Sequence, residues 1–344
     1  QEVYFLLTTE ISSIYKKNNQ VRKVHNVCVF PDFEAVSKMQ DKLEKIGNIR
    51  SDGRPILGFD AKILLEMLLE VDSDAYLIPA HIWTPWFAVL GSKSGFNSIE
   101  ECFDDLTPYI FAVETGLSSD PPMNRVCSFL DKFRLVSNSD AHSLDKLGRE
   151  ANLFDTALSY NSILASLKYD NGFLGTIEFF PQEGKYHYDG HRLCNVVCNP
   201  LETVRHQGIC PVCHKPLTKG VMYRVAELAD RKVEDIPEFN QQHYSITPLL
   251  QILAEIVGVK SSSSTKVQAE YYRLINNLGS EFDILLNCPL PEIKDLGSPV
   301  LAQAIQRLRD GQVQITEGYD GEFGRVKLFQ SGENSVLATP ASLF

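Results

Sequence analysis

The sequence lacks any long apolar run and any excess of basic residues. No stretch approaches the roughly 18 apolar residues of a membrane-spanning helix, and no segment has the features of a signal peptide. From this we expect a cytoplasmic protein that does not act at a membrane. The formal net charge of −11 argues against bulk electrostatic attraction to nucleic acid, although a local basic face still acts over a Debye length.

The length and composition are those of a large globular protein. A chain of 344 residues with 44% hydrophobic residues is long enough for a barrel plus an appended domain, because domains contain roughly 100–250 residues. The sequence starts at Gln1 and enters the apolar segment EVYFLLTTEIS at once. We therefore expect the chain to be a fragment.

Half of the eight cysteines are scattered, and the other half form a tight C-x3-C…C-x2-C cluster. The clustered residues are Cys194, Cys198, Cys210 and Cys213. In a long chain without secretion signals, such spacing predicts a structural zinc ion rather than disulfides, and free thiols in a loop are the alternative. Three nearby histidines could replace one thiolate: His191, His206 and His214.

Polar residues follow several apolar runs at the point where a strand should end. Phe133–Val136 leads directly into Asp140 and His142, and a D-x-H pair there offers an oxygen and a nitrogen to divalent ions. Taken alone, this stretch is equally well explained as a turn. The same pattern recurs upstream, where predicted strands carry or end in Glu10, His25, His81 and Glu114. Together, these residue types predict a site for Zn, Mn or Fe.

Strand and helix patterns alternate over the first half of the chain. Asp32–Ile46 and Asp60–Val71 have helical periodicity, and Asp60 is placed to cap the second of these helices. Alternation of strands with helices predicts a parallel sheet, and this many units in one run favours a barrel. Phe173–Phe180 is a late strand that we expect to close it.

The second half divides into a zinc segment and an accessory part. Basic residues gather around the cysteines, among them Arg192 and Lys215, and suit contacts with backbone phosphates. Val233–Gln242 is polar and predicts a linker. Beyond it we expect helices over Thr247–Val257, Lys266–Leu278 and Pro299–Leu308, a hairpin over Gln312–Phe329 and a frayed end over Ser331–Phe344. The expected domains are residues 1–184, 185–232 and 233–344.

Several longer motifs resemble known families. In order, TTEIS, VRKVHN, IPAHIWTPW, ETGLSSDP and SNSDAH resemble a polymerase-and-histidinol-phosphatase (PHP) domain, a distorted β/α barrel that binds up to three metal ions. GTIEFFPQEGKYHYDGHRLC, GICPVCHKPLT and YRVAELADR resemble endonuclease Q, which cuts DNA 5′ to deaminated bases and abasic sites. The resemblance covers nearly the whole chain. It implies an α/β fold. This fold consists of an incomplete PHP-type distorted β/α barrel, a zinc knuckle and a small, mainly helical domain.

The resemblance also implies roles for individual residues. Glu10 matches a carboxylate that bridges two metals, and His25 and His81 match the histidines that complete one of those sites. Asp140 matches a ligand of the second metal, and His142 a ligand of the third. Glu114 lies at a strand end that usually faces the site. The cysteines match a zinc finger in which His191 could replace one thiol.

One departure from the family pattern has consequences for activity. PHP domains open with an H-x-H motif, and this sequence contains none. We therefore expect one metal position to keep its full ligand set, the chain to be at best weakly active, and the barrel to have an exposed, aggregation-prone edge.

The sequence leaves three functions open. The first is a metal-dependent DNA endonuclease, with damaged DNA as its partner, one structural zinc ion and Zn, Mn, Mg or Fe in the barrel. Trp83 and Trp86 lie in an aromatic loop that serves either as a wall for a flipped base or as ordinary packing. The alternatives are a PHP-type phosphoesterase of small molecules and a catalytically silent, zinc-containing DNA-binding module.

Overall fold

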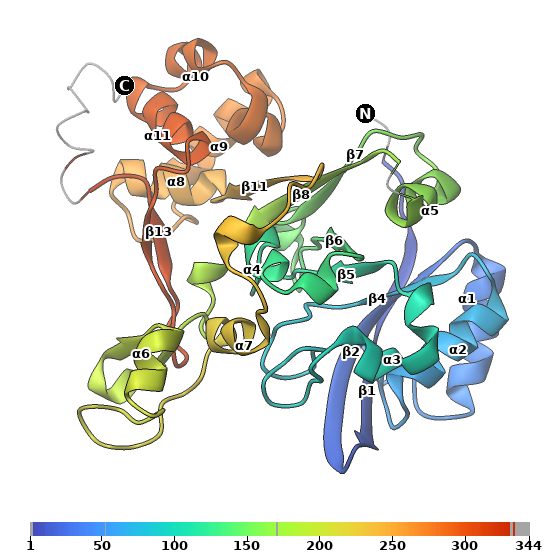
Figure 1. The fold of residues 1–344 in the computed structure, drawn as a ribbon. Helices are drawn as coiled ribbons and strands as arrows, with labels where there is room; N and C mark the ends of the chain where they lie inside the picture. Colours follow the sequence, from blue (N-terminus) through green and yellow to red (C-terminus); the bar gives the residue numbers. More distant parts are fainter. Residues whose placement is uncertain (1–2, 52, 170, 331–332, 334–344) are drawn as a thin grey trace.

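The first part of the molecule is built on a four-stranded sheet with the order β3-β1-β2-β4 (Figure 1). A computed structural model describes residues 3–51, 53–169, 171–330 and 333, and the fold is mixed α/β. The strands are β1 (Leu7–Lys17), β2 (Gln20–Phe30), β3 (Ile56–Leu57) and β4 (Tyr76–Pro79). β1 and β2 form a long antiparallel hairpin whose turn is made by Asn18 and Asn19, both with positive φ. Two consecutive left-handed residues are what a tight two-residue hairpin turn requires.

Two helices cover this sheet and form the first hydrophobic core with it. They are α1 (Phe33–Glu44) and α2 (Ala61–Val71), and they pack against each other and against β2. Asp60 caps α2 as expected, because its side chain accepts a hydrogen bond from the Lys62 backbone N–H. Asp32 caps α1 in the same way. The predicted helices are therefore confirmed within two residues at each end.

The predicted all-parallel sheet is wrong. β2 pairs antiparallel with both β1 and β4, since the Asn-Asn turn leaves no room for the crossover that parallel pairing requires. Parallel pairing joins β1 to β3 and β5 (Ala112–Glu114) to β6 (Arg134–Val136). These short strands bring the ends of β4, β5 and β6 to one side of the molecule.

The late strand does not close a barrel. β8 (Phe173–Phe179) lies at the centre of a separate three-stranded sheet, between β7 (Ala151–Phe154) and β11 (Gln242–Ile246). β11 falls partly in the stretch that the sequence analysis assigned to a linker. β7 and β11 were missed because each is short and lacks clear alternation. α5 (Tyr160–Tyr169) packs against β8, whereas α3 (Ile99–Phe103) and α4 (Pro121–Arg125) contribute buried residues to the first core.

The cysteine-rich segment predicted to bind zinc protrudes from the rest of the molecule, as Figure 1 shows around α6. Its elements are β9 (Asp189–His191), β10 (Val196–Cys198) and α6 (Pro200–Arg205). The chain then returns through α7 (Val221–Leu228), whose Val221 and Val225 are buried in the first core.

The helices of the C-terminal part form a second hydrophobic core, which Ile177 and Phe180 of the β8 segment join. These helices are α8 (Leu249–Val257), α9 (Thr265–Leu278), α10 (Leu290–Leu296) and α11 (Pro299–Arg309). The expected hairpin is confirmed by β12 (Gln314–Thr316) and β13 (Arg325–Lys327), and its turn has positive φ at Asp320 and Gly321. Except for residue 333, the expected frayed end after 330 lies outside the described residues. None of the helices in the described part combines the length and apolar character needed to cross a membrane.

Candidate active site

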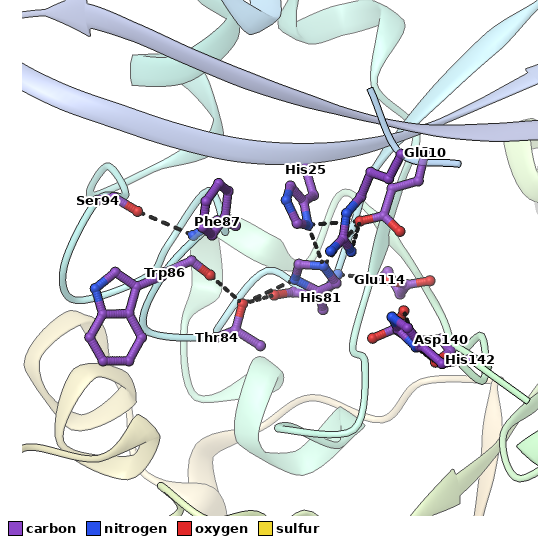
Figure 2. Close-up of polar contacts among 11 residues, drawn as sticks. Glu10, His25, His81, Thr84, Trp86, Phe87, Ser94, Glu114, Asp140 and His142 are labelled. Carbon is purple, nitrogen blue, oxygen red and sulfur yellow. Dashed lines mark hydrogen bonds and ion pairs between the residues drawn. The ribbon is translucent and has the colours of Figure 1, made fainter. Parts of the chain in front are cut away.

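Three side chains from three strands meet at one point (Figure 2). Glu10 projects from β1, His25 from β2, and His81 follows the end of β4. In the β1–β2 register, Glu10 lies opposite Val27 and His25 opposite Ser12, so the two are diagonal neighbours on the same face. His81 reaches them because the Ala80 N–H continues the ladder by donating to the His25 carbonyl at 3.0 Å.

The donor atoms of these three groups lie close enough together to hold one divalent ion. His25 Nδ1 lies 2.7 Å from Glu10 Oε1 and 3.1 Å from His81 Nε2, and His81 Nε2 lies 3.4 Å from Glu10 Oε1. Donor atoms around a tetrahedral ion with bonds of about 2.0–2.1 Å are about 3.3–3.4 Å apart. Two imidazole nitrogens and one carboxylate oxygen form a donor set used by catalytic zinc sites, which leave a fourth position for water or substrate.

The protonation states of two of these groups favour metal binding. Burial alone would raise the pKa of Glu10, but its hydrogen bonds with His25 and His81 hold that pKa well below the usual value. Burial lowers the pKa of His25, so its imidazole stays neutral at neutral pH. A carboxylate and a neutral imidazole are the forms that bind a metal ion.

Arg54 is a site residue that the sequence analysis missed. Its guanidinium Nη1 lies 3.2 Å from Glu10 Oε1, and the pairing of β3 with β1 brings its loop to the site. The loop is fixed by a hydrogen bond from the Ser12 N–H to the Pro55 carbonyl. Nothing in the sequence of this Gly- and Pro-containing loop indicated which strand it would meet.

Glu114 is buried beside the three converging groups. Its Oε2 accepts a hydrogen bond from the His81 backbone N–H and its Oε1 accepts one from Asn138 Nδ2, each at 2.7 Å. The predicted metal ligand is thus used, in this structure, to hold the backbone of another predicted ligand. Burial raises the pKa of Glu114, and His81 and Asn138 oppose that effect.

Asp140 and His142 have different environments. Asp140 lines a cavity of about 410 Å³ together with Glu10, His81 and Glu114. The side chain of His142 is 72% exposed, and its Nδ1 lies 2.9 Å from the Asp140 carbonyl oxygen. His142 thus lies apart from the three converging groups, and its role as a ligand of a third metal stays a prediction.

The aromatic loop also divides into two environments. Trp83 is fully buried, and its indole N–H donates to Asn124 Oδ1 at 2.7 Å, so the expectation that it forms a base-stacking wall is wrong. Trp86 is 46% exposed and lies edge-on to Tyr186.

The cysteine cluster contains one histidine and three cysteines. The metal-binding atoms of His191, Cys194, Cys210 and Cys213 all lie within 4.8 Å of one another. The residue that joins the three cysteines in this group is His191, the replacement that the sequence left open, and Cys198 lies outside the group. Cys198 pairs with Asp189 at the far end of the β9–β10 ladder and is buried against Cys210 and Leu217.

The backbone of the second cysteine pair favours a thiolate. Burial alone would raise the pKa of Cys210, but hydrogen bonds from the backbone at Cys213 and Val212 lower it overall. The Lys215 carbonyl accepts from the Cys210 N–H and closes this turn. Lys215 itself is exposed, and the exposed Arg192 side chain lies 3.7 Å from Glu322.

Comparison with protein families and curated sequences gives relatives of unknown function. A family model described as the MJ0043 C-terminal domain matches residues 248–312. The uncharacterized protein MJ0043 of Methanocaldococcus jannaschii is 29% identical over 271 residues, which are 75% of this chain and 33% of that protein. The uncharacterized protein YqxK of Bacillus subtilis is 30% identical over 261 residues, 74% of this chain and 62% of that protein. The chain thus spans less than two thirds of each of these relatives.

Comparison with solved structures gives neighbours of known activity. The lesion-specific endonuclease PfuEndoQ from Pyrococcus furiosus matches with a TM-score of 0.82 and 28% identity, over 93% of this chain and 77% of that one. An endonuclease Q complex with a 27-mer duplex carrying an abasic lesion at the active site matches with a TM-score of 0.79 and 27% identity, over 96% and 80% of the two chains.

Proposed function

The chain belongs to the endonuclease Q family, and from this premise we propose that it is a metal-dependent DNA endonuclease. The proposed reaction is hydrolysis of the phosphodiester 5′ to a deaminated base (hypoxanthine, uracil or xanthine) or an abasic site, as a step of DNA repair. The observation that carries the proposal is the convergence of the metal-binding atoms of Glu10, His25 and His81 in this fold, at a cavity that Glu10 and His81 line.

We propose that Glu10, His25 and His81 hold one divalent ion, either Zn, Mn, Mg or Fe, and that Asp140 contributes to a second. When bound, such ions supply Lewis acidity to the phosphodiester and activate water as the nucleophile. Glu10 is ionised and His25 is neutral, so neither must lose a proton before binding. Arg54 places a permanent positive charge beside Glu10, and this charge would stabilise the negative charge that develops on a phosphate during cleavage.

We propose that the zinc segment holds one structural zinc ion and contacts DNA. His191 and the three clustered cysteines supply four donors, which close a tetrahedron and stabilise a segment with a very small core. Arg192 and Lys215 are exposed on this segment and suit contacts with backbone phosphates.

We propose three functional parts: a catalytic part over residues 1–184, a zinc segment over 185–232 and an accessory part over 233–344. The packing of α7 into the first core ties the zinc segment to the catalytic part. The match of residues 248–312 to a separate family model supports an accessory unit.

Cleavage of a labelled duplex with one hypoxanthine, uracil or abasic site tests the proposal. We expect a nick 5′ to the lesion that requires a divalent ion and is absent from an undamaged duplex. The rate should be low, because the 344 residues contain no H-x-H motif. Asp140→Asn should abolish cutting and leave DNA binding intact, whereas Asp145→Asn, an exposed residue of the same loop, should leave both unchanged.

The two alternative functions give different results in the same assay. A phosphoesterase of small molecules would hydrolyse a phosphomonoester and neither bind nor cut the damaged duplex. A silent binding module would bind the duplex and leave it uncut with every ion.

A further inference from the structure

The loop that follows β6 is bound to the candidate metal site through Glu114. Glu114 accepts from the His81 N–H with one oxygen and from Asn138 Nδ2 with the other. Since His81 is a proposed ligand, any shift of Glu114 moves the backbone that carries that ligand. Asn138 therefore acts on the metal site without touching the three converging groups.

Asn152 holds this loop from a neighbouring strand. From β7, its Nδ2 donates to Asn138 Oδ1 at 3.1 Å and to the Ser137 carbonyl at 2.9 Å. Its Oδ1 accepts from the Ser137 N–H at 2.9 Å. The side chain of one residue thus fixes both the backbone of Ser137 and the amide of Asn138.

Both positions require an amide. Asn138 must donate to the Glu114 carboxylate and accept from Asn152, and Asn152 must donate to two oxygens and accept from one N–H. An aspartate has nearly the same shape but no N–H donor when ionised. An Asp at 138 would face a carboxylate, and an Asp at 152 would face two oxygens at about 3 Å.

The backbone that this network holds is strained. His81 has φ of +31°, a conformation that a residue with a side chain keeps only where surrounding contacts impose it. A Cβ on Gly116 would lie 2.5 Å from the His81 Cβ, so the backbone of the next loop packs directly against His81. The Ile82 N–H also donates to the Glu114 carbonyl.

A second set of hydrogen bonds fixes the residues that directly follow β5 and β6. The buried Glu178 accepts hydrogen bonds from Thr115 Oγ1 and Ser137 Oγ, each at 3.1 Å. These two donors are the chain neighbours of Glu114 and Asn138. Glu178 therefore holds a chain neighbour of each partner in the Glu114–Asn138 hydrogen bond.

We propose that Asn152 and Asn138 are positioning residues that set His81 for metal binding through Glu114. The inference rests on the proposed metal site and adds to it two residues that touch none of the three ligand atoms.

Cobalt binding followed by absorption tests this proposal in the full chain. Co²⁺ bound by Cys194, Cys210 and Cys213 gives intense thiolate charge-transfer bands, whereas Co²⁺ bound by two histidines and a carboxylate gives only weak visible bands. Each sample thus reports both sites separately. We expect Asn152→Asp and Asn138→Asp to weaken Co²⁺ binding at the histidine site by roughly 10–100-fold, the usual effect of losing a group that orients a ligand.

The matched control is Asn277→Asp, the same chemical change on the exposed face of α9. It should change neither set of bands, and the thiolate bands should persist in all variants. Wild-type affinity at the histidine site in both Asn152→Asp and Asn138→Asp would overturn the inference. If Asn152→Asp also loses its thiolate bands, that variant has unfolded. The Co²⁺ affinity of Asn138→Asp, a change at a half-buried residue, then tests the inference by itself. Thiolate bands without any weak bands in the wild type would overturn the proposed metal site and the inference with it.

Discussion

His191 occupies the place in the cysteine cluster that spacing alone gives to Cys198. The two residues lie on the same short ladder, but Cys198 is buried beside Asp189 and His191 Nδ1 lies 3.5 Å from Cys213 Sγ. We predict that His191→Ala weakens zinc binding by at least roughly tenfold, because it removes a ligand. Cys198→Ser should bind zinc like the wild type. Competition with a chromogenic chelator measures both, and equal losses in the two variants would contradict the assignment.

Glu178 makes stability depend on pH. Burial raises its pKa to about 8, against about 4.5 for an exposed glutamate. Between these values the folded state holds one proton more than the unfolded state, so this group makes stability fall as pH rises, by about 1.4 kcal/mol per unit. Its contribution is fully present below about pH 4.5 and is lost by about pH 8. We predict that Glu178→Gln flattens the decline of urea stability between pH 5 and 8, and an unchanged slope would contradict the account.

At the scale of elements, capping residues and apolar periodicity were enough to locate α1, α2, α8, α9 and α11, whereas the short helix α10 was missed. They did not give the pairing of strands. β7, which carries Asn152, was missed because ANLF is short and half-buried throughout, and its partner strand lies about twenty residues further along the chain. Ligands at strand ends could be named from sequence, whereas Arg54 and Asn152 reach the site only through loop closure and strand pairing.

Gly116 is the position where the loop after β5 is most sensitive to substitution. It has φ of +62°, and an added Cβ would meet the His81 backbone and side chain. We predict that Gly116→Ala lowers the free energy of unfolding by roughly 1–3 kcal/mol or more. Gly208→Ala isolates the backbone effect, because Gly208 has φ of +72° with open space around it, and it should cost only about 1–2 kcal/mol. Urea unfolding measures both free energies of unfolding. Equal losses in the two variants would show that His81 moves aside at no cost, and would contradict the prediction.

At the scale of the whole molecule, Arg224 links α7 to the catalytic part. Its guanidinium donates to the carbonyls of Leu90 and Phe96 and to Asn97 Oδ1. We predict that Arg224→Ala lowers the free energy of unfolding by about 2–4 kcal/mol, because it leaves buried carbonyls without donors. The exposed Arg205→Ala should change it by no more than about 0.5 kcal/mol. A loss in Arg224→Ala as small as in the control would contradict this role.

The arrangement of the sheets explains why the whole fold was harder to foresee than its parts. The family resemblance predicted a barrel, but the described strands up to β8 lie in sheets of four, two and three strands, the last of which also includes β11 from the accessory part. Strand order depends on contacts between distant segments, as in the β8–β11 pair, and periodicity carries no information about them.

The central claim is that Glu10, His25 and His81 hold the ion with which this chain cuts DNA at a lesion. The most direct test is a single-turnover reaction, with protein in excess over a 5′-labelled duplex containing one abasic site, comparing the wild type with His25→Ala and His81→Ala. The account predicts a slow, divalent-ion-dependent nick 5′ to the lesion that both substitutions abolish while duplex binding persists. Cutting that survives both substitutions, or an uncut duplex that is bound by the ion-loaded wild type, would contradict it.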